Sequence, residues 1–328
     1  MPHSSHALSR RQALRLVGSV PMLPIASSLA AAGFTAEALA AEGPNGANVK
    51  YSFGAMAAPS LATPAQMATT YVASTLNKRV GRGPGVTYTL GYDTFFLTGT
   101  EVPKTGGGTI LAGGYVDIQG NPIIDASGAT PRPFFSDCPD GMSLITLPNT
   151  RSGRRGHNRV FAVVQFEYTT RNLAGASMYG LLPSPIAVLT LDQDRSTGKL
   201  SLVSYHNVDT SGVHGLWITC GASLSPWGTH LSSEEYEPDA SVASNAQLQG
   251  FSQNTFGNPT TARPYHYGHL PEVTVYADGT GTIRKHYCLG RISHELVQVC
   301  PDERTVLMGD DATNGGAFMF VADRAKDL

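Results

Sequence analysis

One stretch of the chain combines residues whose types and spacing could bind a metal ion. Cys220 and Glu235 lie fifteen positions apart, and Pro226 and Gly228 break any helix between them. The chain can therefore turn back and bring a thiolate and a carboxylate to one point. Such a pair suits a transition metal such as iron or zinc, whereas carboxylates alone suit calcium or magnesium. The alternative interpretation is a strand end with a buried cysteine and a solvated Glu234–Glu235 pair.

Short antiparallel strands are the elements that must position these residues. Strand–turn–strand units with Asp, Gly or polar turns recur along the chain, at 142–164, 186–205, 272–286 and 296–308, and a further strand is expected at 317–321. Earlier strands are expected at 87–90, 95–98, 109–111 and 115–118, and a short helix at Met67–Leu76. Repeated hairpins with few helices predict an all-β fold, either a sandwich or a propeller.

The N-terminus has the pattern of a twin-arginine export signal. A basic segment at Ser9–Leu14 precedes an apolar stretch from Leu16 to about Ala32, and Ala38–Ala40 supplies small residues for a signal peptidase. A transmembrane anchor is disfavoured because prolines interrupt the apolar stretch. We therefore predict a signal at residues 1–41, one domain at 42–328, a periplasmic or secreted location, and no stable membrane insertion.

The composition of the chain limits the classes of partner that it could bind. Charged residues make up 15% of the chain and the net charge is −2, without a basic patch interleaved with aromatics, so nothing favours nucleic acid. Four cysteines in an exported chain suggest disulfides, and Cys288 could pair with Cys300 on a neighbouring strand. There is no C-x-x-C, G-x-S-x-G, P-loop, Rossmann fingerprint or H-E-x-x-H. We expect a monomer.

Residues 220–235 resemble the signature of the PhoX-type alkaline phosphatases, secreted enzymes with a propeller fold. The matching positions are Cys220, Pro226, Trp227, Gly228, Thr229, Leu231, Glu234 and Glu235. Ser233 stands where the family has a second cysteine, and His230 where it has a second tryptophan. The resemblance implies that Cys220 and Glu235 bind metal.

Three further segments resemble the same family. They are 163–169 (V-V-Q-F-E-Y-T against V-N-H-E-Y-T), 289–295 (L-G-R-I-S-H-E) and 308–311 (M-G-D-D). The resemblance implies metal ligation by Glu295. Glu167 could also bind metal, Asp311 could coordinate a hard cation or cap its turn, and the guanidinium of Arg291 could bind a phosphate. Glu167 could instead be a solvated strand end, and Arg291 could pair with a carboxylate. His294 should face away from Glu295, because adjacent strand residues alternate.

The family resemblance implies hydrolysis of phosphate monoesters, with ferric iron at Cys220 and Glu235 and calcium at Glu295 and further carboxylates. It also implies a six-bladed propeller. Family members run about twice as long as this chain, so we expect the N-terminal part of a truncated, incomplete propeller. Two alternatives remain: a calcium-dependent propeller hydrolase of the lactonase type, which would need no thiolate, and a non-catalytic exported binding protein.

Overall fold

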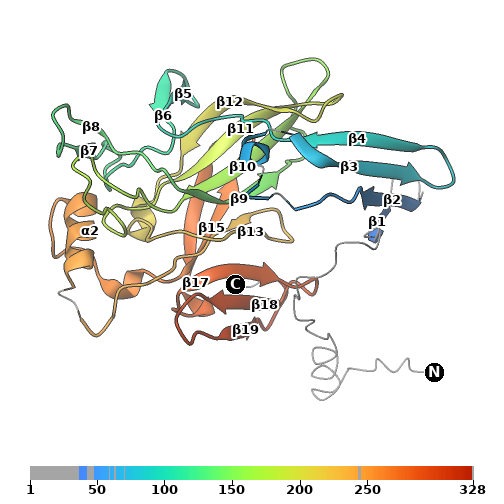
Figure 1. Cartoon of the computed structure of the whole chain (residues 1–328). Helices are drawn as coiled ribbons and strands as arrows, with labels where there is room; N and C mark the ends of the chain where they lie inside the picture. Colours follow the sequence, from blue (N-terminus) through green and yellow to red (C-terminus); the bar gives the residue numbers. More distant parts are fainter. Residues whose placement is uncertain are drawn as a thin grey trace, which may run out of the picture. The chain divides into compact units, whose positions relative to one another are not determined.

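The computed structural model describes residues 37–42, 48–58, 60–62, 64–69, 71–242 and 245–326. The chain divides into two compact units, residues 1–92 and 93–328, whose elements are labelled in Figure 1. Most of the predicted export signal lies on residues 1–36, outside the described residues. The signal and the boundary at residue 41 therefore stay predictions.

The first unit contains one antiparallel sheet, in the order β1-β2-β3-β4. Its strands are β1 (Glu37–Glu42), β2 (Asn48–Phe53), β3 (Tyr71–Val80) and β4 (Gly85–Gly91), and a 3-10 helix, η1 (Pro64–Ala68), precedes β3. The predicted helix at Met67–Leu76 is wrong, because β3 occupies most of that range. Val72 and Thr75 are β-branched, which favours extended backbone over helix.

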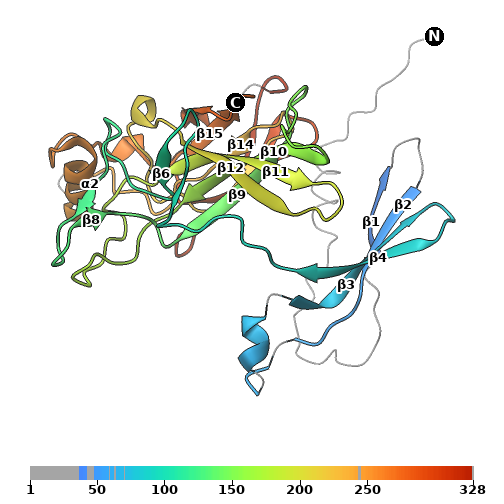
Figure 2. The same ribbon diagram turned by 90° about the horizontal axis from the view of Figure 1, so that it is seen from above.

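The central sheet of the second unit has the order β12-β11-β10-β9. It comprises β9 (Pro139–Ile145), β10 (His157–Phe166), β11 (Ile186–Asp194) and β12 (Leu200–Asn207), which lie side by side in Figure 2. Val160, Ala162 and Val164 pack into one core cluster, whereas Phe161 and Val163 pack into another. Strand β10 is thus buried on both faces, which explains its nearly continuous apolar run.

Two more antiparallel sheets follow in chain order. One consists of β13 (Ser223–Leu224), β14 (His230–Leu231), β15 (Leu270–Val275) and β16 (Gly281–His286), and the other of β17 (His294–Val299), β18 (Thr305–Asp310) and β19 (Ala317–Val321). Strand β13 contacts both β9 and β17, so the three sheets approach one another there. The all-β prediction is confirmed. Successive up-and-down sheets are typical of propeller blades, but the six-bladed, incomplete propeller stays a prediction.

The remaining elements connect these sheets. Two small hairpins pair β5 (Glu101–Pro103) with β6 (Thr109–Leu111), and β7 (Ile124–Asp125) with β8 (Arg132–Pro133). The 3-10 helices are η2 (Ser211–Val213), η3 (Pro264–His266) and η4 (Tyr287–Leu289), and the helix α2 spans Ala246–Phe256. No helix in the described part of the chain is long and apolar enough to cross a membrane.

Three local predictions in this unit are wrong. The segments 95–98 and 115–118 are not continuous strands. Phe95 and Phe96 are instead partly buried against the core cluster around β10, without strand pairing. All four cysteines are free, so the predicted Cys288–Cys300 disulfide is not formed.

Candidate metal centre

A short antiparallel pairing brings the two ends of the Cys220–Glu235 stretch together. Thr219 forms a bridge with Glu234, the Cys220 N–H donates to Ser233 O (3.3 Å), and the Glu235 N–H donates to Ile218 O (3.0 Å). Side chains alternate across a pleated pair. Cys220 and Glu235 therefore share one face, while Glu234 points to the other.

The turn that closes this stretch follows the predicted residues. The Ser225 N–H donates to Thr229 O at 2.8 Å. Gly228 has φ of +84°, a backbone conformation that residues with a Cβ rarely adopt. The glycine between Pro226 and Thr229 thus allows the chain to reverse.

Five acidic or thiol groups lie together on the Cys220 face. Ligand atoms of Cys220, Glu235 and Glu295 lie within 4.8 Å of one another, and so do those of Asp140, Glu167 and Cys220. We call these five residues the acid–thiol cluster. Cys220 belongs to both groups of three, so its sulfur lies between two sets of carboxylates.

Two sheets and the Cys220–Glu235 stretch supply the cluster. Asp140 lies in β9, Glu167 directly follows β10, and Glu295 lies in β17. The pairing of β17 with β18 is interrupted between His294 and Val297, and such a bulge redirects the side chain of the intervening residue. The cluster therefore forms where strand ends from different sheets meet.

Two glycines permit this close approach. A Cβ on Gly221 would lie 2.2 Å from the backbone oxygen of Glu295, and a Cβ on Gly141 would lie 2.8 Å from Cys220 O. Both distances are shorter than real Cβ contacts, so only glycine lets the backbones of β9 and β17 come this near to Cys220.

The cluster is rich in negative charge and lacks a compensating cation. None of the ion pairs among the described residues involves a member of the cluster. Burial, followed by the hydrogen bond with Glu167 and the surrounding carboxylates, raises the pKa of Glu235 well above its usual range. Burial and the charges of Asp140 and Glu295 likewise raise the pKa of Glu167.

The Cys220 thiol and one carboxylate oxygen of Glu295 also lack compensating partners. Burial and the charge of Glu235 raise the pKa of the Cys220 thiol, and the buried Oε2 of Glu295 has no hydrogen-bond partner in the part of the chain that the structure describes. Buried carboxylates normally pair with a cation or coordinate a metal. The residues present therefore fit one or more bound metal ions.

Asp311 lies at the border of the cluster. Its charge contributes to raising the pKa of Glu235. The Tyr236 hydroxyl donates to Asp311 Oδ2 at 2.6 Å, and this hydrogen bond, the largest cause, raises the pKa of Tyr236 to about 12. Tyr236 is thus a protonated donor that orients Asp311. All five metal-ligand residues predicted from sequence, Cys220, Glu235, Glu295, Glu167 and Asp311, lie in this region.

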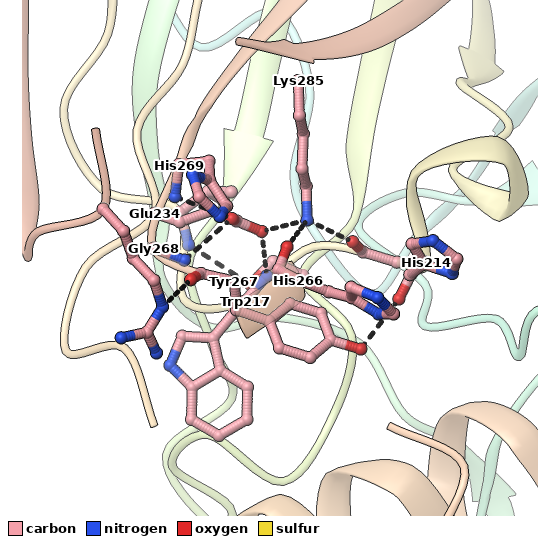
Figure 3. A network of polar contacts seen from close by, with 12 residues as sticks. His214, Trp217, Glu234, His266, Tyr267, Gly268, His269 and Lys285 are labelled. Atoms are coloured by element: carbon pink, nitrogen blue, oxygen red, sulfur yellow. Dashed lines mark hydrogen bonds and ion pairs between the residues drawn. The ribbon is translucent and has the colours of Figure 1, made fainter. Parts of the chain in front are cut away.

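Glu234 lies in a different, fully satisfied site (Figure 3). Its carboxylate pairs with Lys285 Nζ at 2.8 Å, and both side chains are completely buried. The N–H groups of Trp217 (2.9 Å), Gly268 (3.1 Å) and His269 (3.1 Å) also donate to it. Because this carboxylate has a cation and three backbone donors, it has no unmet need for a metal.

Arg291 and His294 have the contacts and burial of structural residues. Arg291 donates from Nε to Tyr267 O (2.8 Å) and from Nη2 to Pro238 O and Pro264 O. Its phosphate role stays a prediction, since most of its donors serve backbone carbonyls. His294 is buried, and burial lowers its pKa to about 4, in keeping with its predicted orientation away from Glu295.

Sequence reasoning missed Asp140 and a buried polar chain behind Cys220. His230 lies 2.9 Å from Ser143 Oγ through Nδ1 and 3.1 Å from Gln165 Oε1 through Nε2. The Gln165 amide donates to the carbonyls of Cys220 and Gly221. Gln165 and His230 are two of the positions at which the sequence departs from the family pattern, and the two side chains contact each other.

Matching each donor to an acceptor fixes which group donates in each hydrogen bond between Ser143, His230 and Gln165. Burial lowers the pKa of His230 to about 3, so its ring is neutral. Because the Gln165 NH₂ group faces two carbonyls, its oxygen must accept from the His230 Nε2–H, and Ser143 must donate to Nδ1. The chain Ser143–His230–Gln165 thereby holds the backbone of Cys220.

Comparison with known proteins agrees with the sequence resemblance. Residues 194–327 match the family model described as alkaline phosphatase PhoX. This segment is PhoX-like. It contains Cys220, Glu235, Glu295 and Asp311, whereas Asp140 and Glu167 precede it. The resemblance inferred from the sequence is thus confirmed over the PhoX-like segment. The expected truncation stays a prediction.

One solved structure was also found, described as Pseudomonas fluorescens PhoX in complex with vanadate, a transition state analogue. It is 19% identical, with a TM-score of 0.43, and the alignment covers 71% of this chain and 47% of that chain. This chain therefore spans about half the length of its structural relative. No curated protein sequence matches the chain.

Proposed function

We propose that this chain is a metal-dependent phosphatase that hydrolyses small-molecule phosphate monoesters outside the cytoplasm, after export by the twin-arginine machinery. The observation that carries the proposal is the acid–thiol cluster, with four carboxylates and one thiol and no ion-paired cation among the described residues. The match of residues 194–327 to a phosphatase family supports the same reaction class.

The metals are those that the family resemblance implies, and the donor types are compatible with them. Cys220 is the only soft ligand of the cluster, so Cys220 and Glu235 would hold the iron. Glu295, Glu167, Asp140 and Asp311 offer hard oxygen ligands, which suit calcium. The bound cations would supply the positive charge that neutralises the phosphate oxygens during displacement.

The protein's own side chains prepare this site. Tyr236 donates to Asp311 and fixes the orientation of that carboxylate. The Ser143–His230–Gln165 chain holds the Cys220 carbonyl. Such supporting hydrogen bonds keep metal ligands in place, and their loss typically lowers metal affinity or activity about 10- to 100-fold.

Replacement of the thiol tests the proposal. We expect Cys220→Ala to lose its iron and at least about 100-fold of its activity, because a ligand contributes more than the groups that support it. Metal content is measured by mass spectrometry on exported protein, and activity by hydrolysis of a chromogenic phosphate monoester with calcium present. Cys288→Ala is the matched control, since Cys288 is free and exposed, and it should retain both.

The outcomes separate the alternatives. Unchanged iron in Cys220→Ala would contradict the thiolate assignment. Calcium without iron in the unaltered protein, with activity on lactones but not on phosphate esters, would favour the lactonase type. A folded protein with neither metal nor activity would favour the binding protein.

A further inference from the structure

A polar cavity lies at the end of the central sheet where β10 begins and β11 ends. Its volume is about 580 Å³, within the range of pockets that hold small molecules. The loop between β9 and β10 forms much of its wall, and Leu147 and Val160 form part of its floor.

The lining of this cavity is strongly basic. It includes five arginines and one histidine but no aspartate or glutamate, namely Arg151, Arg154, Arg155, Arg159, Arg195 and His157. The whole chain has only 23 lysines and arginines and a net charge of −2. More than a fifth of its basic side chains thus gather around one cavity, which we call the arginine pocket.

Most of these guanidinium groups are available to a ligand. Among the described residues, the side chains of Arg151, Arg154 and Arg155 have no ion-pair or hydrogen-bond partner. Arg195 donates only from Nε, to Asn158 Oδ1 (2.8 Å). Arg159 pairs with Asp192 through Nη2 (3.2 Å), but its buried Nε lacks a partner.

Nearby acids do not neutralise the pocket. Asp192 compensates Arg159, and Asp194 lies 3.8 Å from His157 Nε2. Asp194 also accepts hydrogen bonds from Ser196 and from the Thr197 N–H. Neither acid lines the cavity, so the three unpaired arginines and Arg195 keep their positive charge without a counter-ion from the described residues.

The arginine pocket is separate from the acid–thiol cluster. Strand β10 starts at His157, in the pocket, and ends at Phe166, next to Glu167 of the cluster. At about 3.3 Å per residue, the strand separates the two regions by roughly 30 Å. The pocket therefore does not contact a substrate held at the cluster.

We propose that the arginine pocket binds a small anion carrying more than one phosphate group. Guanidinium groups match phosphate oxygens through paired, charge-assisted hydrogen bonds. Several unpaired guanidiniums around one cavity exceed what a single phosphate needs, because one phosphate offers only a few oxygens. The limited volume of about 580 Å³ favours a compact ligand over a long polyanion.

Calorimetric titration of the full-length, metal-loaded protein tests this proposal. The probes are methylenebisphosphonate, whose P–C–P bridge resists hydrolysis, and inorganic phosphate. We expect bisphosphonate to bind at least tenfold more tightly than phosphate, and more weakly as salt is raised. Arg154→Gln/Arg155→Gln should weaken bisphosphonate binding at least tenfold, and Arg195→Gln by a smaller factor. Both arginines of the double variant are exposed and unpaired, so the fold should be retained.

Arg132→Gln/Arg171→Gln is the matched control, because it removes two charges from residues outside the pocket. It should leave bisphosphonate affinity unchanged. The proposal is overturned if the pocket variant binds as tightly as the unaltered protein, or if the control loses as much. It is also overturned if a single-stranded oligonucleotide binds through the same arginines while bisphosphonate does not.

Discussion

Glu234 and Glu235 are neighbours in the chain but lie in opposite electrostatic surroundings. Glu234 has Lys285 and three backbone N–H donors (Figure 3). Glu235 faces Cys220, Glu167 and Glu295. The difference arises from the pleat at the Thr219–Glu234 bridge, which sends successive side chains to opposite faces.

This comparison separates two uses of a buried carboxylate. On the Glu234 face, the fold itself supplies the compensating charge, so the site stabilises the protein without a ligand. On the Glu235 face, the fold gathers acids and withholds the cation, so the charge must come from outside. Glu272 belongs to the first kind, because Arg284 (2.6 Å) and His286 (2.8 Å) pair with it.

The largest expected effect comes from removing the cation of the Glu234 site. Lys285→Met leaves a completely buried carboxylate without a counter-charge, which typically costs about 3–5 kcal/mol. Urea unfolding should show this loss in the free energy of unfolding. Lys199→Met is the control, because its ion pair with Asp93 is exposed and should change stability by less than about 1 kcal/mol. Equal effects of the two substitutions would show that Glu234 does not depend on Lys285.

A smaller effect, and one that depends on pH, is expected at Glu272. Burial alone would raise its pKa, but hydrogen bonds from His286, Thr229, Trp227 and Arg284 outweigh burial and lower the pKa well below its usual range. A lowered folded-state pKa contributes stability that is present above the unfolded pKa of about 4.3 and is lost as pH falls further. We expect Glu272→Gln to cost about 2 kcal/mol at pH 7 and progressively less below about pH 4.

Unfolding curves from pH 7 to pH 2 provide the measurement. The stability difference between the unaltered protein and Glu272→Gln should shrink as the carboxylate is protonated in both states. Glu101→Gln serves as the control, since Glu101 is exposed on β5 and has no ion-pair partner among the described residues. A difference at Glu272 that stays constant across this range would show that shape rather than charge holds the site together.

Local pattern was enough to predict much of the fold. The four strand–turn–strand units became the hairpins β9–β10, β11–β12, β15–β16 and β17–β18, because alternating residues and turn residues act over short distances. The helix predicted at Met67–Leu76 is wrong although the strand signals there are local, namely the β-branched Val72 and Thr75 and the short turn that joins β3 to β4. Phe95 and Phe96 are partly buried by distant core residues rather than by strand pairing.

The site could be predicted only for residues in segments that resemble the family pattern. Cys220, Glu235 and Glu295 lie in such segments, and the structure brings their side chains together. Asp140 was missed because its role depends on β9 lying beside β13, a contact that only the three-dimensional fold creates. The partnership of Gln165 with His230, 65 positions apart, was hidden for the same reason.

The smallest expected change in stability comes from replacing Glu235 in protein stripped of metal by a chelator. The direction of this change, a gain rather than a loss of stability, is its most informative feature. Like charges crowd around Glu235 without a cation, so its carboxylate should destabilise the metal-free fold. Glu235→Gln should therefore raise the free energy of unfolding of the metal-free protein by about 1 kcal/mol. Glu303→Gln is the control, because its surface pair with Lys326 should matter by less than about 1 kcal/mol.

Adding metal should reverse which protein is the more stable, the unaltered protein or Glu235→Gln. A ligand that binds only the folded state stabilises it in proportion to its affinity, and Glu235→Gln should bind metal more weakly than the unaltered protein. The unaltered protein should then become the more stable one in the presence of iron and calcium. If Glu235→Gln is less stable under both conditions, Glu235 is a structural carboxylate like Glu234. The contrast between the two faces of this strand pair would then disappear.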